Sequence, residues 1–230
     1  MSHQVNYQLI RSERRSIALI VRPDGGVEVR APRAITQDTI DEFLSKKQLW
    51  LKRRLDEFER YRKPFYEKRY LSGESFRYLG RQYILKVVPD GGDFVRIEGR
   101  KLAIHSSKAL DDADWNRRLV QRWLDGRKTQ VFMQQYREAC QRFGLREEQA
   151  PQLRIKSMRT RWGSYSHKTN TVYLNARLVE APTEAIRMVC IHELCHLKHR
   201  AHDKAFYAAM DRYQDANWRR VKEKLEIQYG

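Results

Sequence analysis

The sequence predicts an α+β protein with a β-rich N-terminal half and a C-terminal half in which a helix packs on a small antiparallel sheet. Short alternating or β-branched segments, separated by turns rich in Gly and Pro, fill residues 1–110 and return after Pro151. Longer segments with apolar residues at helical spacing separate and follow them. We expect a basic N-terminal region of residues 1–110 and a C-terminal region of residues 111–230, which could also form one compact unit.

Two hairpins are expected in the N-terminal half. Residues 16–22 and 27–30 form one pair of strands, and residues 83–88 and 94–97 form the other. Each pair is joined by the same turn sequence, Pro-Asp-Gly-Gly, which is typical of a tight connection between strands.

A long helix is predicted between the hairpins, with Thr36 as its N-cap and Pro64 limiting its extension. Apolar residues recur along one face at helical spacing. The other face carries basic residues, namely Lys46, Lys47, Lys52, Arg53, Arg54 and Arg60. This face is either simply solvated or a stripe that faces phosphates.

A second long helix is expected to begin at residues 111–114, because acidic side chains favour the first turn. Gly144 would end this helix and Gly126 could interrupt it. Strands should follow at residues 153–156 and 171–175.

The composition favours an anionic partner. Lys and Arg total 46 against 29 Asp and Glu, a formal net charge of +17. Such an excess attracts nucleotides, nucleic acid or acidic peptides, although a basic but inert surface is the alternative. No secretory signal and no apolar run of about 20 residues is visible, so we expect a soluble cytoplasmic protein without a membrane partner. Cys140, Cys190 and Cys195 are expected to be reduced, mostly buried thiols, and the oligomeric state is left open.

The clearest chemical signal is a His-Glu-x-x-His sequence, formed by His192, Glu193 and His196. The two histidines are four residues apart, so on a helix their imidazoles share one face and can bind one zinc ion. Glu193 lies about 100° round the helix, where it can act as general base on a metal-bound water without ligating the metal. Zn²⁺ is the expected cofactor, although histidine sites also bind nickel, cobalt and manganese.

A catalytic zinc ion usually has three protein ligands, and His199 or His202 could be the third. On a helix that continues to residue 199, the Cα atoms of His199 and His192 would be roughly 10 Å apart, a poor arrangement for tetrahedral ligation. A helix is expected from near Thr183 through His199, so His202 follows its end, and Asp203 can cap a further helix that runs towards Leu225. We therefore predict His192, His196 and His202 as ligands, with His199 supporting a ligand without binding the metal.

Four segments resemble the YgjP-like family of bacterial metal-dependent hydrolases, distant relatives of the SprT-like and WLM zinc proteases. They are residues 161–166 (RWGSYS), residues 174–178 (LNARL), residues 192–197 (HELCHL), and His202 with Phe206. The resemblance implies a zincin-like C-terminal half, zinc ligation by the three histidines and catalysis by Glu193. The sequence departs from the pattern at Tyr165, where the family usually has Cys, which excludes a thiol role there.

The resemblance also implies that residues 161–166 lie against the active-site cleft. Arg161, Trp162, Gly163 and Tyr165 are therefore candidate substrate-binding residues. Gly163 would allow a close backbone approach and Arg161 would bind an anion. The alternative is a tight turn between two strands with a core tryptophan.

Three functions fit these residues. The first is a zinc metallopeptidase, with residues 171–175 pairing with an extended substrate. The second is a nucleoside triphosphate pyrophosphatase that converts UTP to UMP and pyrophosphate, an activity associated with the family. The third is a nucleic-acid-associated protease resembling the SprT-like relatives. The oxyanion-stabilising group is open among Arg161, Tyr165, His199 and Tyr207.

Overall fold

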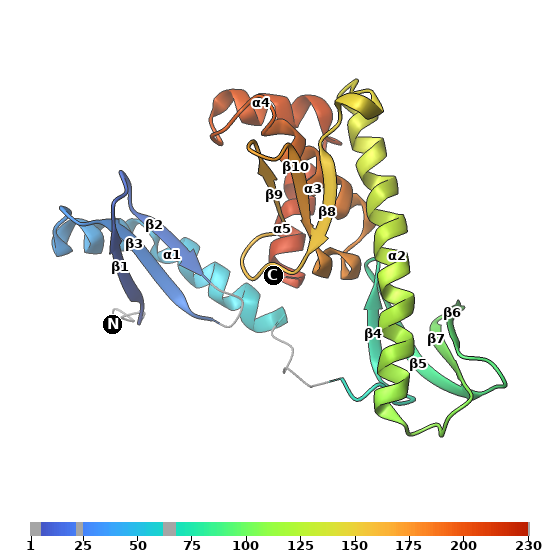
Figure 1. The fold of residues 1–230 in the computed structure, drawn as a ribbon. Coiled ribbons are helices and arrows are strands. Elements are labelled where there is room, and N and C mark those ends of the chain that lie inside the picture. Colours follow the sequence, from blue (N-terminus) through green and yellow to red (C-terminus); the bar gives the residue numbers. More distant parts are fainter. Residues whose placement is uncertain (1–5, 22–24, 62–67, 230) are drawn as a thin grey trace. The chain divides into compact units, whose positions relative to one another are not determined.

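The computed structural model describes residues 6–21, 25–61 and 68–229, with the side chains of residues 57–61 excepted (Figure 1). The described chain has the α+β architecture that the sequence predicts, with three small mixed sheets and five α-helices. It divides into two compact units, residues 1–65 with 224–230 and residues 66–223. None of the described helices has the length and apolar character needed to span a membrane.

The first unit is a three-stranded sheet with a long helix. Strands β1 (Gln8–Ser12), β2 (Ala18–Val21) and β3 (Val27–Pro32) precede helix α1 (Gln37–Tyr61). Strand β3 is central and pairs antiparallel with β2, which confirms the first predicted hairpin. It also pairs parallel with β1, which was not predicted.

The core of this unit is formed by Val29, Ala31 and Ile40, all fully buried. The hydroxyl of Thr36 accepts a hydrogen bond from the backbone N–H of Thr39 at 3.4 Å, as expected of an N-cap residue.

The second unit begins with a four-stranded sheet of strands β4 (Ser75–Tyr78), β5 (Arg81–Pro89), β6 (Phe94–Glu98) and β7 (Lys101–Ser106). The order is β4-β5-β7-β6, so the second predicted hairpin is wrong. Strand β7 lies between its two expected members, parallel to β5 and antiparallel to β6. Leu102, Ala103 and Ile104 of β7 are fully buried, and burying this apolar segment at the centre outweighs the local turn signal.

A tight turn joins β4 to β5 and contacts a distant part of the chain. Leu79 and Gly80 both have positive φ, at 46° and 77°, as a two-residue hairpin turn requires. Their backbone N–H groups donate to the carbonyls of Val179 and Glu180 at 2.8 and 2.9 Å. A Cβ atom added at Gly80 would lie 2.6 Å from Cγ of Pro182, so the turn is closely fitted to the segment before the next long helix.

Helix α2 (Ala113–Arg142) packs beside both sheets of this unit (Figure 1). The carboxylate of Asp112 accepts from the N–H of Trp115 at 2.9 Å, and Gly144 follows the helix with a φ of 67°. Both predicted ends are confirmed. The helix runs through Gly126 without a break, so the predicted interruption is wrong. A single glycine lowers the stability of a helix by only about 1 kcal/mol relative to alanine, and the packing of the flanking turns offsets this loss.

The second sheet of the unit contains β8 (Gln152–Lys156), β9 (Gly163–Ser166) and β10 (Thr171–Asn175), in the order β8-β10-β9. Strand β10 is parallel to β8 and antiparallel to β9, so the predicted antiparallel sheet is in fact mixed. The reason is β9, which reverses the chain between the two expected strands and leaves them pointing the same way. Residues 163–166 are therefore a strand, and the tight-turn interpretation of this segment is wrong.

Three helices complete the chain, α3 (Thr183–Cys195), α4 (Lys204–Tyr213) and α5 (Trp218–Gln228). The short 3-10 helices η1 (Glu147–Gln149) and η2 (Ala176–Glu180) lie on either side of the second sheet in the sequence. Helix α3 ends earlier than the predicted residue 199, and the predicted last helix is two helices separated at residues 214–217. The side-chain amide of Gln214 donates to the carbonyl of Met188 at 2.8 Å, which ties this break to α3.

Candidate metal centre

Three imidazoles meet where α3 ends. His192 lies in the last turn of α3, His196 is its C-cap, and His202 lies in the loop before α4. One ring nitrogen from each lies within 4.8 Å of the others. The Nε2 atoms of His192 and His202 are 3.0 Å apart, close to the roughly 3.3 Å between two nitrogens that share a tetrahedral zinc ion.

The backbone fixes the tautomer of His196. Its Nδ1 lies 2.8 Å from the carbonyl oxygen of His199, which can only accept, so Nδ1 carries the proton. In the neutral ring the lone pair is then on Nε2. Hydrogen bonding of the second ring nitrogen to a backbone carbonyl is the usual support of a metal-ligating histidine. His199 thus contributes its carbonyl group, while its own imidazole is not a member of the cluster.

A capped helix and a buried ring position His202. The carboxylate of Asp203 accepts from the N–H of Phe206 at 2.9 Å, which starts α4 directly after His202. The Phe206 ring is fully buried, and its centroid lies 4.9, 4.9 and 4.5 Å from those of His192, His196 and His202. Phe206 therefore packs against all three imidazoles, a role that its spacing from His202 did not reveal.

Strand β9 holds the Glu193 carboxylate. The Glu193 side chain is 5% exposed and accepts a hydrogen bond from the backbone N–H of Tyr165. A Cβ atom added at Gly163 would lie 2.6 Å from Oε1 of Glu193 and 2.9 Å from Cγ1 of Val189. Only glycine leaves room for the carboxylate here, so the close approach at Gly163 is one to the Glu193 side chain. Whether Gly163 also contacts a substrate stays a prediction.

Burial sets the ionisation of the site. It raises the pKa of Glu193 to about 8, and the Tyr165 N–H and the Arg161 charge oppose this rise. Burial also lowers the pKa of His192 to about 3, reinforced by the neighbouring His202 and His196, and it lowers the pKa of His202. Burial thus favours the neutral form of His192 and His202, which is the form that binds a metal ion.

The remaining candidate residues lie at the start of β9. Arg161 is exposed, and its charge acts on Glu193 from the loop. Trp162 is half-buried under the guanidinium of Arg177 at 5.5 Å, and its carbonyl accepts from the N–H of Asn175 at 2.8 Å. The Tyr165 hydroxyl points away from Glu193 and donates to Asn170 at 2.8 Å.

Asn175 is a structural residue of the site that the sequence interpretation missed. Its side-chain amide donates to the carbonyls of Met158 and Arg161, both at 2.8 Å, and is almost fully buried. It therefore fixes the loop that leads into β9. Its position in the LNARL segment was the available signal, but residue type alone does not distinguish a loop anchor from a strand terminus.

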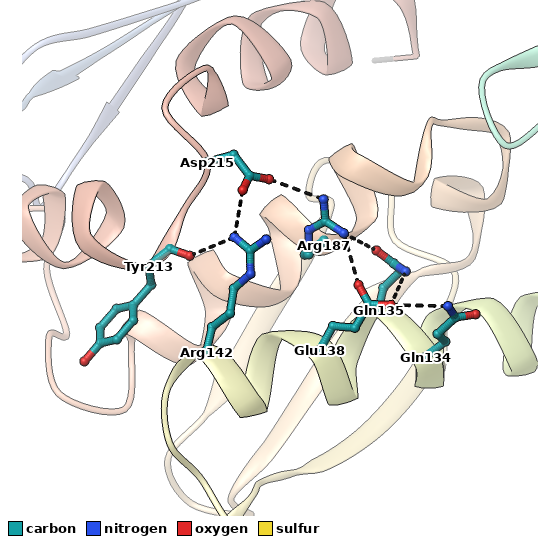
Figure 2. A network of polar contacts seen from close by, with 7 residues as sticks. All are labelled: Gln134, Gln135, Glu138, Arg142, Arg187, Tyr213 and Asp215. Atoms are coloured by element: carbon teal, nitrogen blue, oxygen red, sulfur yellow. Dashed lines mark hydrogen bonds and ion pairs between the residues drawn. The ribbon is translucent and has the colours of Figure 1, made fainter.

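A polar network anchors α3 from the side away from its sheet (Figure 2). Arg187 of α3 donates to Glu138 of α2 at 3.0 Å and to Asp215, between α4 and α5, at 3.3 Å. Asp215 also accepts from Arg142 at 3.0 Å, and Arg142 donates to the carbonyl of Tyr213 at 3.3 Å (Figure 2). Arg187 thus connects α3 to α2 and to the segment between α4 and α5.

The three cysteines lie inside the protein as free thiols, as predicted. Burial raises the pKa of Cys140 and of Cys190, and it raises the pKa of Cys195 to about 12. A protonated thiol is a poor metal ligand, so these residues do not compete with the histidines.

Comparisons with known proteins agree with the motifs. The family model described as "YgjP-like, metallopeptidase domain" matches residues 15–228. Two solved structures are similar to part of this chain, each over 41% of it. One is the metallopeptidase zymogen abylysin of Pyrococcus abyssi, at 18% identity over 90% of that chain with a TM-score of 0.37. The other is the metallopeptidase zymogen jannalysin of Methanocaldococcus jannaschii, at 26% identity over 86% of that chain with a TM-score of 0.36.

No curated protein sequence matches this chain significantly. The family match covers residues 15–228, far beyond the His-Glu-x-x-His segment. The resemblance expected from the four motif segments is therefore confirmed, and the chain belongs to the YgjP-like family.

Proposed function

We propose that this protein is a zinc-dependent metallopeptidase in which His192, His196 and His202 hold the metal and Glu193 is the general base. The convergence of three imidazoles beside one buried carboxylate carries this proposal. The donor set fits zinc, because three nitrogen ligands leave a fourth position for water in a tetrahedral site. Nickel, cobalt and manganese are the competing metals.

The chemistry follows from the residues around the metal position. Bound zinc would lower the pKa of water towards about 7 and polarise a substrate carbonyl. Glu193 would accept the proton from that water and deliver it to the leaving amine. The Tyr165 N–H and the absence of a side chain at Gly163 hold the carboxylate in one orientation for both transfers.

The sheet beside α3 favours an extended peptide as substrate. Strand β10 was expected to pair with it, but both edges of β10 are occupied by β8 and β9, so that expectation is wrong. Strand β9 is the edge strand of this sheet and also contacts Glu193 through its backbone. An extended peptide that adds to β9 would bring its carbonyl groups past the carboxylate.

The test compares two substrate classes on the same preparation. Zinc-loaded protein is incubated with an unfolded protein and, separately, with UTP and other nucleoside triphosphates. We expect peptide-bond cleavage, and we expect Glu193→Gln to reduce it about 100-fold or more while zinc content stays at that of the parent. Pyrophosphate release that Glu193→Gln abolishes, without peptide cleavage, would replace the peptidase with the pyrophosphatase.

The ligand set is tested with a matched histidine pair. His202→Ala should lose zinc in a metal-content measurement, because it removes a donor. His199→Ala should keep zinc, because the carbonyl that orients His196 belongs to the backbone and remains. Zinc loss in His199→Ala but not in His202→Ala would reverse the assignment.

A further inference from the structure

The four-stranded sheet has one covered face and one open face. Tyr78 lies on the covered face, where its ring contacts Trp123 of α2 at 4.9 Å and its hydroxyl accepts from Arg127 at 3.0 Å. Strand register and alternation put a set of buried apolar residues on the same face, namely Phe76, Tyr83, Leu85, Val87, Val95, Leu102 and Ile104. The residues between them therefore face away from α2.

The open face is cationic. Lys86 of β5, Arg96 of β6 and Lys101 of β7 lie on it, and all three are exposed. Among the described strand residues of this face, Glu98 is the only one with a carboxylate, and it forms an ion pair with Arg96. Lys86 and Lys101 form no ion pair with any residue that the structure describes, so their charges are available to a partner.

A cavity of about 350 Å³ lies at one end of the sheet, where the covered and the open face meet. It is lined by Arg81, Gln82, Tyr83, Gly99 and Arg100, without a carboxylate. Within the described chain, neither Arg81 nor Arg100 has an ion-pair partner. Gln82 belongs both to the cavity and to the open face, whereas Arg81 and Tyr83 lie on the covered face, so the cavity borders the open face at this end of the sheet.

An aromatic ring is presented on the same face. Phe94 is 41% exposed and stacks on His105, with centroids 4.2 Å apart and planes at 9°. His105 is held from both sides, by Asp90 at 2.8 Å and Glu98 at 3.3 Å. The Phe94 ring thus has a fixed support in His105, and the guanidinium carbon of Arg96 lies over the ring at 5.5 Å from its centroid. A planar group that stacks on the exposed part of the ring would therefore also meet this cation.

We propose that the open face of the four-stranded sheet binds single-stranded nucleic acid. Phosphates would contact Lys86, Lys101 and the Arg81–Arg100 cavity, and a base would stack on Phe94. Cations along a groove together with an exposed aromatic ring are the two elements of sequence-tolerant single-strand binding. An acidic peptide would use the charges but not the ring. This binding is independent of the proposed peptidase activity.

The test measures binding of the full chain to fluorescent 20-mers of dT and of U over a salt series, with the matching duplex in parallel. The variant Lys86→Gln/Arg100→Gln/Lys101→Gln should bind about tenfold more weakly or worse. Its slope of log affinity against log salt should fall in magnitude by about 2, because three single-strand phosphate contacts are lost. The DNA and RNA arms show which strand is preferred.

A matched control separates this face from the net charge of +17. The variant Lys47→Gln/Lys52→Gln/Arg53→Gln removes the same charge from exposed positions on α1 and should bind as the parent does. Equal weakening by both triple variants would overturn the proposal, because charge anywhere would then suffice.

The aromatic contribution is tested with Phe94→Ala, which should weaken single-strand binding roughly fivefold or more and leave duplex binding unchanged. Phe94→Leu keeps an apolar contact with His105 and should behave as Phe94→Ala does if stacking is the cause. Unchanged single-strand binding in both variants, or binding of polyglutamate in place of the 20-mers, would overturn the proposal.

Discussion

The two sheets of the second unit present their polar groups in opposite ways. In β8-β10-β9, an edge strand is pressed against α3 so closely that Gly163 has no room for a methyl group beside Glu193. In β4-β5-β7-β6, one face is left open and its cations are exposed. The position of the Glu193 carboxylate depends on close packing against Gly163 alone. The positive potential of the open face is instead the sum of several exposed charges, each weakened by solvent and salt. A single substitution should therefore be severe in the first sheet and mild in the second.

The largest effect is expected from Gly163→Ala. The added methyl would displace the Glu193 carboxylate, and a misplacement of about 1 Å can reduce turnover about 100-fold. Peptidase turnover and zinc content should be measured together, with zinc retained. Gly91→Ala is the matched control, since nothing lies within 4 Å of its added Cβ atom. Equal activity of the two variants would show that the fit at β9 is irrelevant to catalysis.

The next effect is expected from Gly80→Ala, which should lower the free energy of unfolding by about 2–4 kcal/mol. The positive φ of Gly80 costs about 1–2 kcal/mol for alanine, and the overlap with Pro182 adds to it. Gly99→Ala has a positive φ of 57° but open space, so it should cost only the first part. Urea unfolding measures both, and equal losses would mean that the Pro182 contact contributes nothing.

A smaller loss, about 1–2 kcal/mol, is expected for Arg187→Met. The side chains of Arg187, Glu138 and Asp215 are 23%, 36% and 50% exposed, so solvent screens the pairs and limits their contribution. Asp215→Asn should cost less than Arg187→Met. A double-mutant cycle between Arg187 and Glu138 gives the coupling directly, and a coupling near zero would make the network in Figure 2 incidental.

The smallest effect has the opposite sign. Gly126→Ala should raise the free energy of unfolding by about 0.5–1 kcal/mol, because alanine favours the helix and nothing lies within 4 Å of the added atom. Helix α2 contacts both sheets, and its stability therefore affects both of them. The added methyl group at Gly126 contacts no other residue, so the variant should leave the Glu193 site and the open sheet face unaltered. Changed turnover or changed 20-mer binding would show that the two surfaces respond to global stability rather than to their own residues.

The sequence allowed the proximity of His192, His196 and His202 to be predicted, because the information for it is local. The four-residue spacing of His192 and His196 defines one helix face, and a turn followed by the Asp203 cap leaves few positions for His202. The ends of α2 were predicted for the same reason, since caps act within one helical turn. The imidazole of His199 is not part of the cluster, but α3 ends at Cys195, so the helix that the geometric argument assumed does not reach residue 199.

The errors arise where the partner is distant in sequence. The turn at residues 89–92 predicts a change of direction, but it cannot show that β7 will enter between β5 and β6. Likewise, no local pattern distinguishes a turn at residues 161–166 from the edge strand that holds Glu193. Strand pairing is decided by burial across the whole sheet, which a single sequence shows only indirectly.

The turn at Leu79 and Gly80 provides the unit with a built-in reporter. The backbone N–H groups of Leu79 and Gly80 donate to carbonyls just before α3. They therefore exchange with solvent only when the four-stranded sheet separates from that segment. Their protection against hydrogen–deuterium exchange therefore measures the opening of the region that leads into the histidine cluster. This measurement needs no substitution near the histidine cluster.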